Sequence, residues 1–152
     1  MIDLTSDLQV LAATCAGEAR GDVTPDEEGV ACVVMNRVKI AKTYVVNHGH
    51  AHPLYGNGTV ANCCLMRMQF DAWNQGDPNR AWIWAQEWDG SSSDQSVAKA
   101  LSIASQALAG ALPDVTNGAT SYKATSLPWP HAWGPEIAPV AVLGKQSFYI
   151  LT

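Results

Sequence analysis

Positive charge is scarce in this sequence and is nowhere concentrated. The 152 residues include 9 Lys and Arg against 14 Asp and Glu, which gives a formal net charge of −5. Proteins that bind nucleic acids need a basic patch that neutralises phosphates and releases counterions. The composition therefore argues against a nucleic-acid partner.

Long apolar runs and a leader-like start are missing as well. A helix that crosses a bilayer needs about 20 consecutive apolar residues, and no such stretch occurs. The chain begins Met-Ile-Asp-Leu-Thr-Ser-Asp, without the basic start and apolar core of a secretory signal. We therefore expect neither membrane insertion nor a signal peptide.

Cysteine is limited to four positions, and none of their spacings matches a paired Cys-x-x-Cys zinc motif. Cys15 and Cys32 fall in apolar helical patterns, which favours buried free thiols, with a disulfide left open as the alternative. We expect no structural metal. The other two cysteines are the adjacent Cys63 and Cys64.

The remaining composition fits one folded domain that spans residues 1–152. Hydrophobic residues make up 47% of the chain and charged residues 15%, unlike the charge-rich composition of disordered segments. A chain of this length can bury about two-thirds of the surface that its unfolded form exposes. No second domain is needed.

The N-terminal segment has the spacing of an amphipathic helix that runs to about Ala19, with Thr5 or Ser6 as its N-cap. At about 100° per residue, Glu18 lies beside Leu11 at the edge of the apolar stripe. One carboxyl group is thus expected at the rim of the core. The apolar positions are Leu8, Leu11, Ala12, Cys15 and Ala19.

A second helix is predicted to start at Thr24, where Pro25 suits the first helical position and Glu27 completes a capping box. Residues 44–62 are rich in Gly, Asn, His and Pro, which predicts a long loop. The buried face of this helix is expected to consist of Val30, Val33, Val34, Val38 and Ala41.

Two further helices and a small sheet are predicted in the rest of the chain. Residues 79–88 favour a short helix, and another is capped near Ser93 or Asp94 and ends around Gly110. The expected fold is α+β, mainly helical with a small antiparallel hairpin. The short strands are expected at residues 120–122, 140–143 and 147–150, with the last two joined across Gly144-Lys145.

A carboxyl group at the rim of a core is suited to proton transfer. Partial burial raises the pKa of a Glu side chain and keeps it protonated near neutral pH, as protonation of a glycosidic oxygen requires. Glu18 has this setting. The alternative is an exposed Glu at a helix end that makes only a surface contact.

Several short motifs follow one another in an order and spacing typical of one enzyme family. The first is Glu18-Ala-Arg-Gly21 at a helix end, and the second is Asn36-Arg-Val38. Together they resemble the spore cortex-lytic type of cell-wall hydrolase over nearly the whole chain. The other matching segments are Gln69–Asn74, Asp77–Arg80, Asn117–Tyr122 and the strand region Gly144–Tyr149.

The resemblance implies a lysozyme-like α+β fold that cuts peptidoglycan between N-acetylmuramic acid and N-acetylglucosamine, with Glu18 as the catalytic acid. Such enzymes resemble lytic transglycosylases, in which the muramic sugar's own hydroxyl attacks and an anhydromuramic end forms, so one carboxylate suffices. The implied partner is the glycan strand, without a cofactor, and we expect a monomer. Without a leader, release by lysis or delivery by a particle, as for a bacteriophage endolysin, is the expected route to the wall.

A muramidase would use a second carboxylate. Asp71 is the candidate because it lies in the Gln-Phe-x-x-Trp segment, where relatives commonly carry Ser; a solvated loop acid is the alternative. The resemblance also allows several side chains to bind sugar, with core packing as the alternative for the aromatic ones. These are Gln69, Phe70, Trp73, Thr120, Tyr122, Trp129 and Trp133.

Two other functions stay open. His48, His50 and His52 could hold the zinc ion of a peptidoglycan amidase, although their spacing matches no zinc motif and polar loop histidines are the simpler interpretation. A wall-binding module without catalysis would explain the tryptophans and the departures from the family pattern at Asp71 and Lys123.

Overall fold

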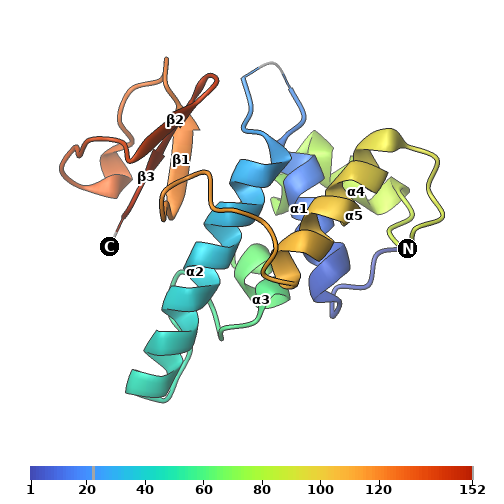
Figure 1. The fold of residues 1–152 in the computed structure, drawn as a ribbon, viewed down its shortest axis with the longest axis horizontal. Coiled ribbons are helices and arrows are strands. Elements are labelled where there is room, and N and C mark those ends of the chain that lie inside the picture. Colours follow the sequence, from blue (N-terminus) through green and yellow to red (C-terminus); the bar gives the residue numbers. More distant parts are fainter. Residues whose placement is uncertain (22, 152) are drawn as a thin grey trace.

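The computed structural model describes residues 1–21 and 23–151, with most of the helices on one side of the long helix α2 and a small sheet on the other (Figure 1). This arrangement confirms the predicted α+β class. The helices are α1 (Asp7–Glu18), α2 (Glu27–His48), α3 (Val60–Leu65), α4 (Pro78–Ala85) and α5 (Gln95–Leu108), with short 3₁₀ helices η1 (Asp71–Trp73) and η2 (His131–Trp133). The strands are β1 (Ser121–Ala124), β2 (Ala141–Leu143) and β3 (Gln146–Tyr149).

Helix α1 begins and ends where the sequence predicts. The Ser6 hydroxyl accepts a hydrogen bond from the backbone N–H of Gln9 at 3.2 Å, which satisfies a free donor of the first turn. Residues 10–17 are all buried. Glu18 follows them at the point where the helix leaves the core.

Helix α2 starts two residues later than predicted, with Asp26 rather than Thr24 at the N-cap position. The Thr24 hydroxyl donates to the carbonyl oxygens of Ala19 and Gly21, at 3.0 Å each, so it closes the turn after α1. The predicted capping box is therefore wrong. Glu27 is instead the first helical residue, and its side chain is buried.

The predicted face of α2 is confirmed, but the predicted loop over residues 44–62 is wrong at both ends. Helix α2 continues to His48 and ends at Gly49, which has a left-handed φ of 73°. The short helix α3 follows, capped by Thr59. Exposed polar side chains in the last turns of α2, which protrudes from the body in Figure 1, hid the helical period. The buried face is Val30, Val33, Val34, Val38 and Ala41.

Helices α4 and α5 are both capped by aspartate. Asp77 and Asp94 each accept a hydrogen bond of 2.8 Å from a backbone N–H in the first turn. The prediction for α5 is confirmed. Helix α4 ends at Ala85, so Trp88 lies beyond it, where its buried indole N–H donates to the Ile83 carbonyl at 2.9 Å.

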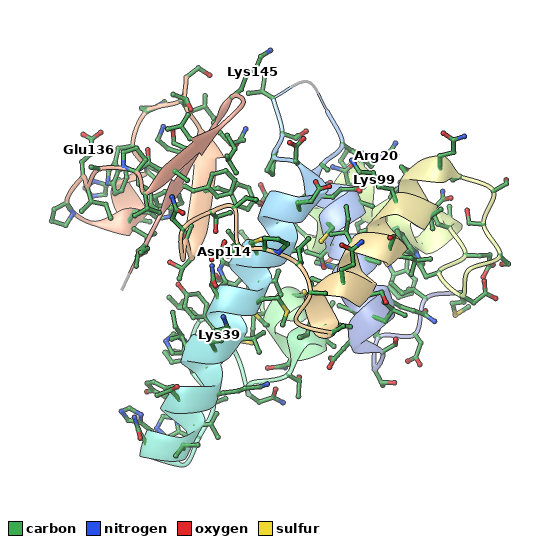
Figure 2. All side chains as sticks on the ribbon, in the orientation of Figure 1. Arg20, Lys39, Lys99, Asp114, Glu136 and Lys145 are labelled. Carbon is green, nitrogen blue, oxygen red and sulfur yellow. The ribbon has the colours of Figure 1, made fainter. Side chains whose placement is uncertain are left out.

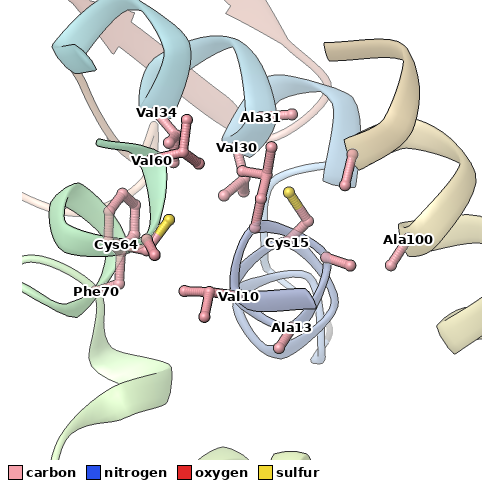
Figure 3. Close-up of a cluster of buried hydrophobic side chains, with 14 of the residues drawn as sticks. Val10, Ala13, Cys15, Val30, Ala31, Val34, Val60, Cys64, Phe70 and Ala100 are labelled. Carbon is pink, nitrogen blue, oxygen red and sulfur yellow. The ribbon is translucent and has the colours of Figure 1, made fainter. Parts of the chain in front are cut away.

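Helix α1 forms the centre of the core, where it contacts α2, α3 and α5. Figure 3 shows Val10 and Cys15 of α1 among side chains from the neighbouring helices, including Val30 of α2 and Cys64 of α3. All four cysteines are buried and free, which confirms the expectation for Cys15 and Cys32.

The sheet has the strand order β1-β3-β2, with both pairings antiparallel and Tyr122 opposite Phe148. The β2–β3 turn across Gly144-Lys145 confirms the predicted hairpin. Phe148 packs against α2 at Gly29, where an added Cβ would lie 3.0 Å from the ring. The missing side chain at Gly29 therefore lets the sheet approach the helix.

The six charged side chains labelled in Figure 2 are spread over several helices and loops rather than gathered in one patch. In the part of the chain that the structure describes, the one ion pair joins the Met1 amino group to Glu87 at 2.6 Å. No helix among these residues is long and apolar enough to cross a membrane.

Candidate active site

The Glu18 carboxyl group is held between two hydrogen-bond donors from distant parts of the chain. The Tyr122 hydroxyl on β1 donates to Oε1 at 2.6 Å, and the backbone N–H of Ala72 on η1 donates to Oε2 at 3.0 Å. Glu18 itself is the last residue of α1 and is half-buried. Three elements therefore meet at one carboxyl group.

Burial is the main influence on the protonation of Glu18. It raises the pKa of the carboxyl group above its usual value, because the charged form loses hydration. The hydrogen bonds from Tyr122 and Ala72 act in the opposite direction and lower the pKa, whereas the nearby charges of Asp71 and Asp77 raise it. The net shift is upward, which favours a group that can deliver a proton near neutral pH.

Close packing between α1 and η1 places the Ala72 donor. Gly17 precedes Glu18, and a Cβ built at Gly17 would lie 2.8 Å from Ala72 Cβ and 2.9 Å from Ile83 Cδ1. The indole N–H of Trp73 donates to the Thr14 hydroxyl of α1 at 2.8 Å. Glycine at position 17 thus allows η1 to approach the end of α1.

Tyr122 can serve Glu18 in both protonation states. Burial, followed by the charge of Glu18, raises the pKa of the Tyr122 phenol well above its usual value, so the phenol keeps its proton. A hydroxyl can donate to a carboxylate or accept from a protonated carboxyl group. The sequence predicted a sugar-binding role for Tyr122, and the structure places its hydroxyl on the candidate acid.

Two of the predicted sugar-binding residues lie in the interior. Phe70 is 2% exposed and belongs to the core. The structure therefore shows core packing, which was the alternative to sugar binding for this residue. Thr120 is 1% exposed, and its hydroxyl bonds the backbone of Leu151 as both donor and acceptor. Neither side chain offers a surface to a ligand.

The other predicted residues near Glu18 are more accessible. Gln69 and Trp73 are half-buried in the segment that leads into and through η1. Asp71 is exposed, accepts a hydrogen bond from the Asn74 side-chain amide at 3.1 Å, and is close enough to raise the pKa of Glu18. The structure therefore brings Asp71 together with the candidate acid.

Trp129 and Trp133 form a separate aromatic cluster with Tyr149. The ring centroids lie 5.0–5.8 Å apart in edge-to-face arrangements, and the Trp129 indole N–H donates to the Gly134 carbonyl at 2.8 Å. Both tryptophans are half-buried. These contacts hold the proline-rich loop against the sheet.

Tyr44 is surrounded by the three histidines of residues 48–52. His48 stacks on the tyrosine ring with a centroid distance of 3.9 Å, and His50 and His52 meet its edges at 5.5 and 4.8 Å. His52 Nδ1 accepts two backbone N–H groups. Among the described residues, no group of three or more His, Cys, Asp and Glu side chains is arranged to hold a metal ion.

A hollow of about 410 Å³ lies along the end of α2, with Lys39, Tyr44 and His48 in its lining. Neither Glu18 nor the groups that contact it line this hollow. This hollow therefore lies apart from the candidate site, which is identified by its half-buried carboxyl group and the two donors.

Two contributors to the site were not predicted from sequence. Ala72 contributes its backbone N–H, and no side-chain type indicates such a donor in a sequence. Its position in the Gln-Phe-x-x-Trp segment, which belongs to the family resemblance, was the available signal. Arg37 is buried and its Nε donates to the Thr120 carbonyl at 2.6 Å, two residues before Tyr122. The Asn-Arg-Val motif that contains Arg37 is part of the family resemblance, but it suggested no role for this side chain.

Comparison with known proteins gives a family. A family model described as Cell Wall Hydrolase matches residues 23–149, which is most of the chain. The matched range begins after Glu18, so the role of that residue rests on the geometry above. No curated protein and no solved structure matched the chain. By the extent of the family match, the chain belongs to the cell wall hydrolase family.

Proposed function

We propose that this cell wall hydrolase cuts the glycan strands of peptidoglycan as a lytic transglycosylase, with Glu18 as general acid and then general base. The observation that carries the proposal is the half-buried Glu18 carboxyl group between the Tyr122 hydroxyl and the Ala72 N–H. The finer likeness to the spore cortex-lytic type, and a bacteriophage endolysin as its setting, belong to the same proposal.

The reaction needs one carboxyl group. Protonated Glu18 gives its proton to the glycosidic oxygen as the bond from C1 of the muramic sugar breaks, and the leaving strand keeps that oxygen as a hydroxyl. The C6 hydroxyl of the same sugar then bonds to C1 and loses its proton to the Glu18 carboxylate. The acid is restored, an anhydromuramic end forms, and no water is consumed.

The setting of Glu18 suits both halves of this cycle. Burial raises its pKa and supplies the acid, whereas the Tyr122 and Ala72 donors stabilise the carboxylate left after proton transfer. The Tyr122 hydroxyl can reverse its hydrogen bond as the proton leaves and returns. A surface Glu without these contacts would be ionised throughout at neutral pH.

The test combines one variant with product analysis. Glu18→Gln keeps the shape of the side chain but cannot carry the proton, so we expect loss of wall lysis with an unchanged circular dichroism spectrum. Mass spectrometry of peptidoglycan digested by the wild type should show anhydromuramic ends. Lysis by the Gln variant at the wild-type rate would contradict the role of Glu18.

Hydrolysis by a muramidase mechanism is the second candidate. It is favoured by Asp71, an exposed carboxylate near enough to raise the pKa of Glu18 and so able to orient an attacking water. Reducing muramic ends in the same mass spectra, in place of anhydro ends, would select this candidate.

A further inference from the structure

Arg37 is a buried cation with no carboxylate partner among the described residues. Its side chain is 6% exposed, and the one ion pair in the described part of the chain joins Met1 to Glu87. Taking a guanidinium group out of water without a carboxylate partner is costly. Stability alone therefore does not account for arginine at this position.

The guanidinium group is fixed in place from several sides. Its Nε donates to the Thr120 carbonyl at 2.6 Å, and Nη1 makes a longer contact of 3.5 Å with Gln69 Oε1. The guanidinium carbon lies 4.8 Å from the Phe70 ring centroid and 5.2 Å from that of Tyr55. The two rings hold the plane of the group, and its N–H donors point at two chain segments.

These two segments are the ones that supply the donors of Glu18. The carbonyl contact lies two residues before Tyr122 in the chain, and the contact with the amide lies three residues before Ala72. We propose that Arg37 is a positioning residue that fixes both donors relative to Glu18. This inference rests on the proposed function and adds a residue that orients its acid without touching substrate.

Asn36, the residue before Arg37, also ties α2 to the segment that leads into β1. The Asn36 side-chain amide donates to the Ala119 carbonyl at 3.0 Å, one residue before the carbonyl that Arg37 holds. Two consecutive side chains of α2 thus bind the two consecutive carbonyls just before β1. Helix α2 thereby sets the position of this strand on one side, while Arg37 reaches the segment before η1 on the other.

A positioning role predicts a particular change in Glu18. The Tyr122 and Ala72 hydrogen bonds lower the pKa of Glu18, so their loss should raise it further. The protonated acid is needed for catalysis, and activity is lost on the basic side as it ionises. Loss of Arg37 should therefore move the basic limb of the pH profile of kcat to higher pH.

The first variant is Arg37→Lys, which keeps the charge and loses the planar set of donors. We expect kcat to fall by about tenfold or more, the cost of slight misplacement of an acid, with KM nearly unchanged and the basic limb shifted upward. Arg80→Lys is the matched control, since Arg80 lies over the Trp84 ring of α4 at 5.8 Å, and it should change neither quantity.

A double-mutant cycle separates positioning from general damage to the fold. If Arg37 acts through Tyr122, then Arg37→Lys should cost much less in a Tyr122→Phe background than in the wild type. Fully additive effects together with an unmoved basic limb would overturn the proposal, because a purely structural loss has no reason to depend on Tyr122.

A readout without substrate keeps the test independent of the reaction. Titration of the Glu18 carboxyl carbon by NMR, assigned with Glu18→Gln, should give a higher pKa in Arg37→Lys than in the wild type. If Arg37→Lys does not fold, Gln69→Met removes the second contact and should raise the same pKa; an unchanged value would overturn the proposal. A wild type that releases no sugar product would contradict the proposed function alone.

Discussion

At Glu18 two physical effects oppose each other, and their balance determines what the residue can do. Burial is the larger influence and raises its pKa, whereas the donated hydrogen bonds from Tyr122 and Ala72 lower it. With burial alone the group would hold its proton more tightly and would be a weaker proton donor. The donors limit the upward shift and leave a group able to both give and take a proton.

Replacement of the tyrosine tests this balance at its strongest contact. Tyr122→Phe removes the 2.6 Å hydrogen bond to Oε1, so the pKa of Glu18 should rise. We expect the basic limb of the kcat profile to move to higher pH and kcat to fall by about tenfold, the usual cost of one lost hydrogen bond to a charged group. Steady-state kinetics on purified walls measure both.

Tyr44→Phe is the control for loss of a phenolic hydroxyl, because Tyr44 lies among the histidines at the end of α2. It should leave the profile in place. A Tyr122→Phe enzyme whose basic limb moved to lower pH would mean that water reaches the vacated position and hydrates the carboxylate.

Glu27 makes a separate prediction about stability. Its side chain is 6% exposed, Oε2 has no hydrogen-bond partner, and burial raises its pKa. Because the folded state binds the proton more tightly than the unfolded state, this contribution to stability is fully present below the unfolded pKa and is lost as pH rises through the folded pKa. Ionised Glu27 therefore destabilises the fold at neutral pH.

Glu27→Gln should accordingly raise the free energy of unfolding at pH 7, because the neutral amide does not bear the desolvation cost of a buried carboxylate. Below pH 4 the gain should vanish, because both states of the wild type are then protonated. Urea denaturation at the two pH values measures the difference. Glu28→Gln controls for loss of a charge in the same helical turn, and an equal gain in both variants would contradict the explanation.

The sequence predicted the position of the candidate acid but not the groups that contact it. Helical spacing was enough to place Glu18 at the rim of the core, since that property belongs to one helix. The Tyr122 hydroxyl is 104 residues away along the chain, and only the docking of the sheet on α2 brings it to Oε1. Phe70 and Thr120 were predicted to bind sugar but are buried, because a motif does not reveal which of its side chains face inward.

Among the elements, the junction of α1 with η1 is the tightest near the site. A methyl group at Gly17 would fall within 3 Å of both Ala72 Cβ and Ile83 Cδ1. Alanine is favoured over glycine inside a helix by about 0.5–1 kcal/mol, whereas forced overpacking costs about 1–3 kcal/mol. The packing cost should therefore exceed the helical gain.

Gly17→Ala should thus lower the free energy of unfolding, by up to about 2.5 kcal/mol on these figures. It should also lower wall lysis in the fraction that remains folded, because η1 carries the N–H donor of Ala72. Chemical denaturation and a lysis assay at low temperature measure the two effects. A more stable variant with full activity would show that α1 and η1 separate at no cost.

The elements differ in how far the sequence predicted them. Helix α5 and the β2–β3 hairpin were predicted well because each has a clear period and a recognisable boundary. The start of α2 was misplaced because Thr24 and Glu27 have the spacing of a capping box, yet the Thr24 hydroxyl turns back to α1. Helix α3 was missed because its six residues are too few to show a period.

On the scale of the whole molecule, the candidate site is assembled across α2. Glu18 and Ala72 come from the helical side, Tyr122 comes from the sheet, and Phe148 and Arg37 attach the sheet to the helix between them. A sheet detached from α2 would leave the acid with one donor. Docking of the sheet on α2 and completion of the site are therefore one event.

The four buried thiols offer a way to observe opening of this structure in solution. Cys15 lies in the central helix, Cys32 of α2 donates to the Pro113 carbonyl, and burial raises the pKa of the Cys63 thiol to about 11. Such sulfurs react with alkylating reagents only when the surrounding structure opens. The native chain thus contains its own reporters of transient opening, in α1, α2 and α3, without any introduced label.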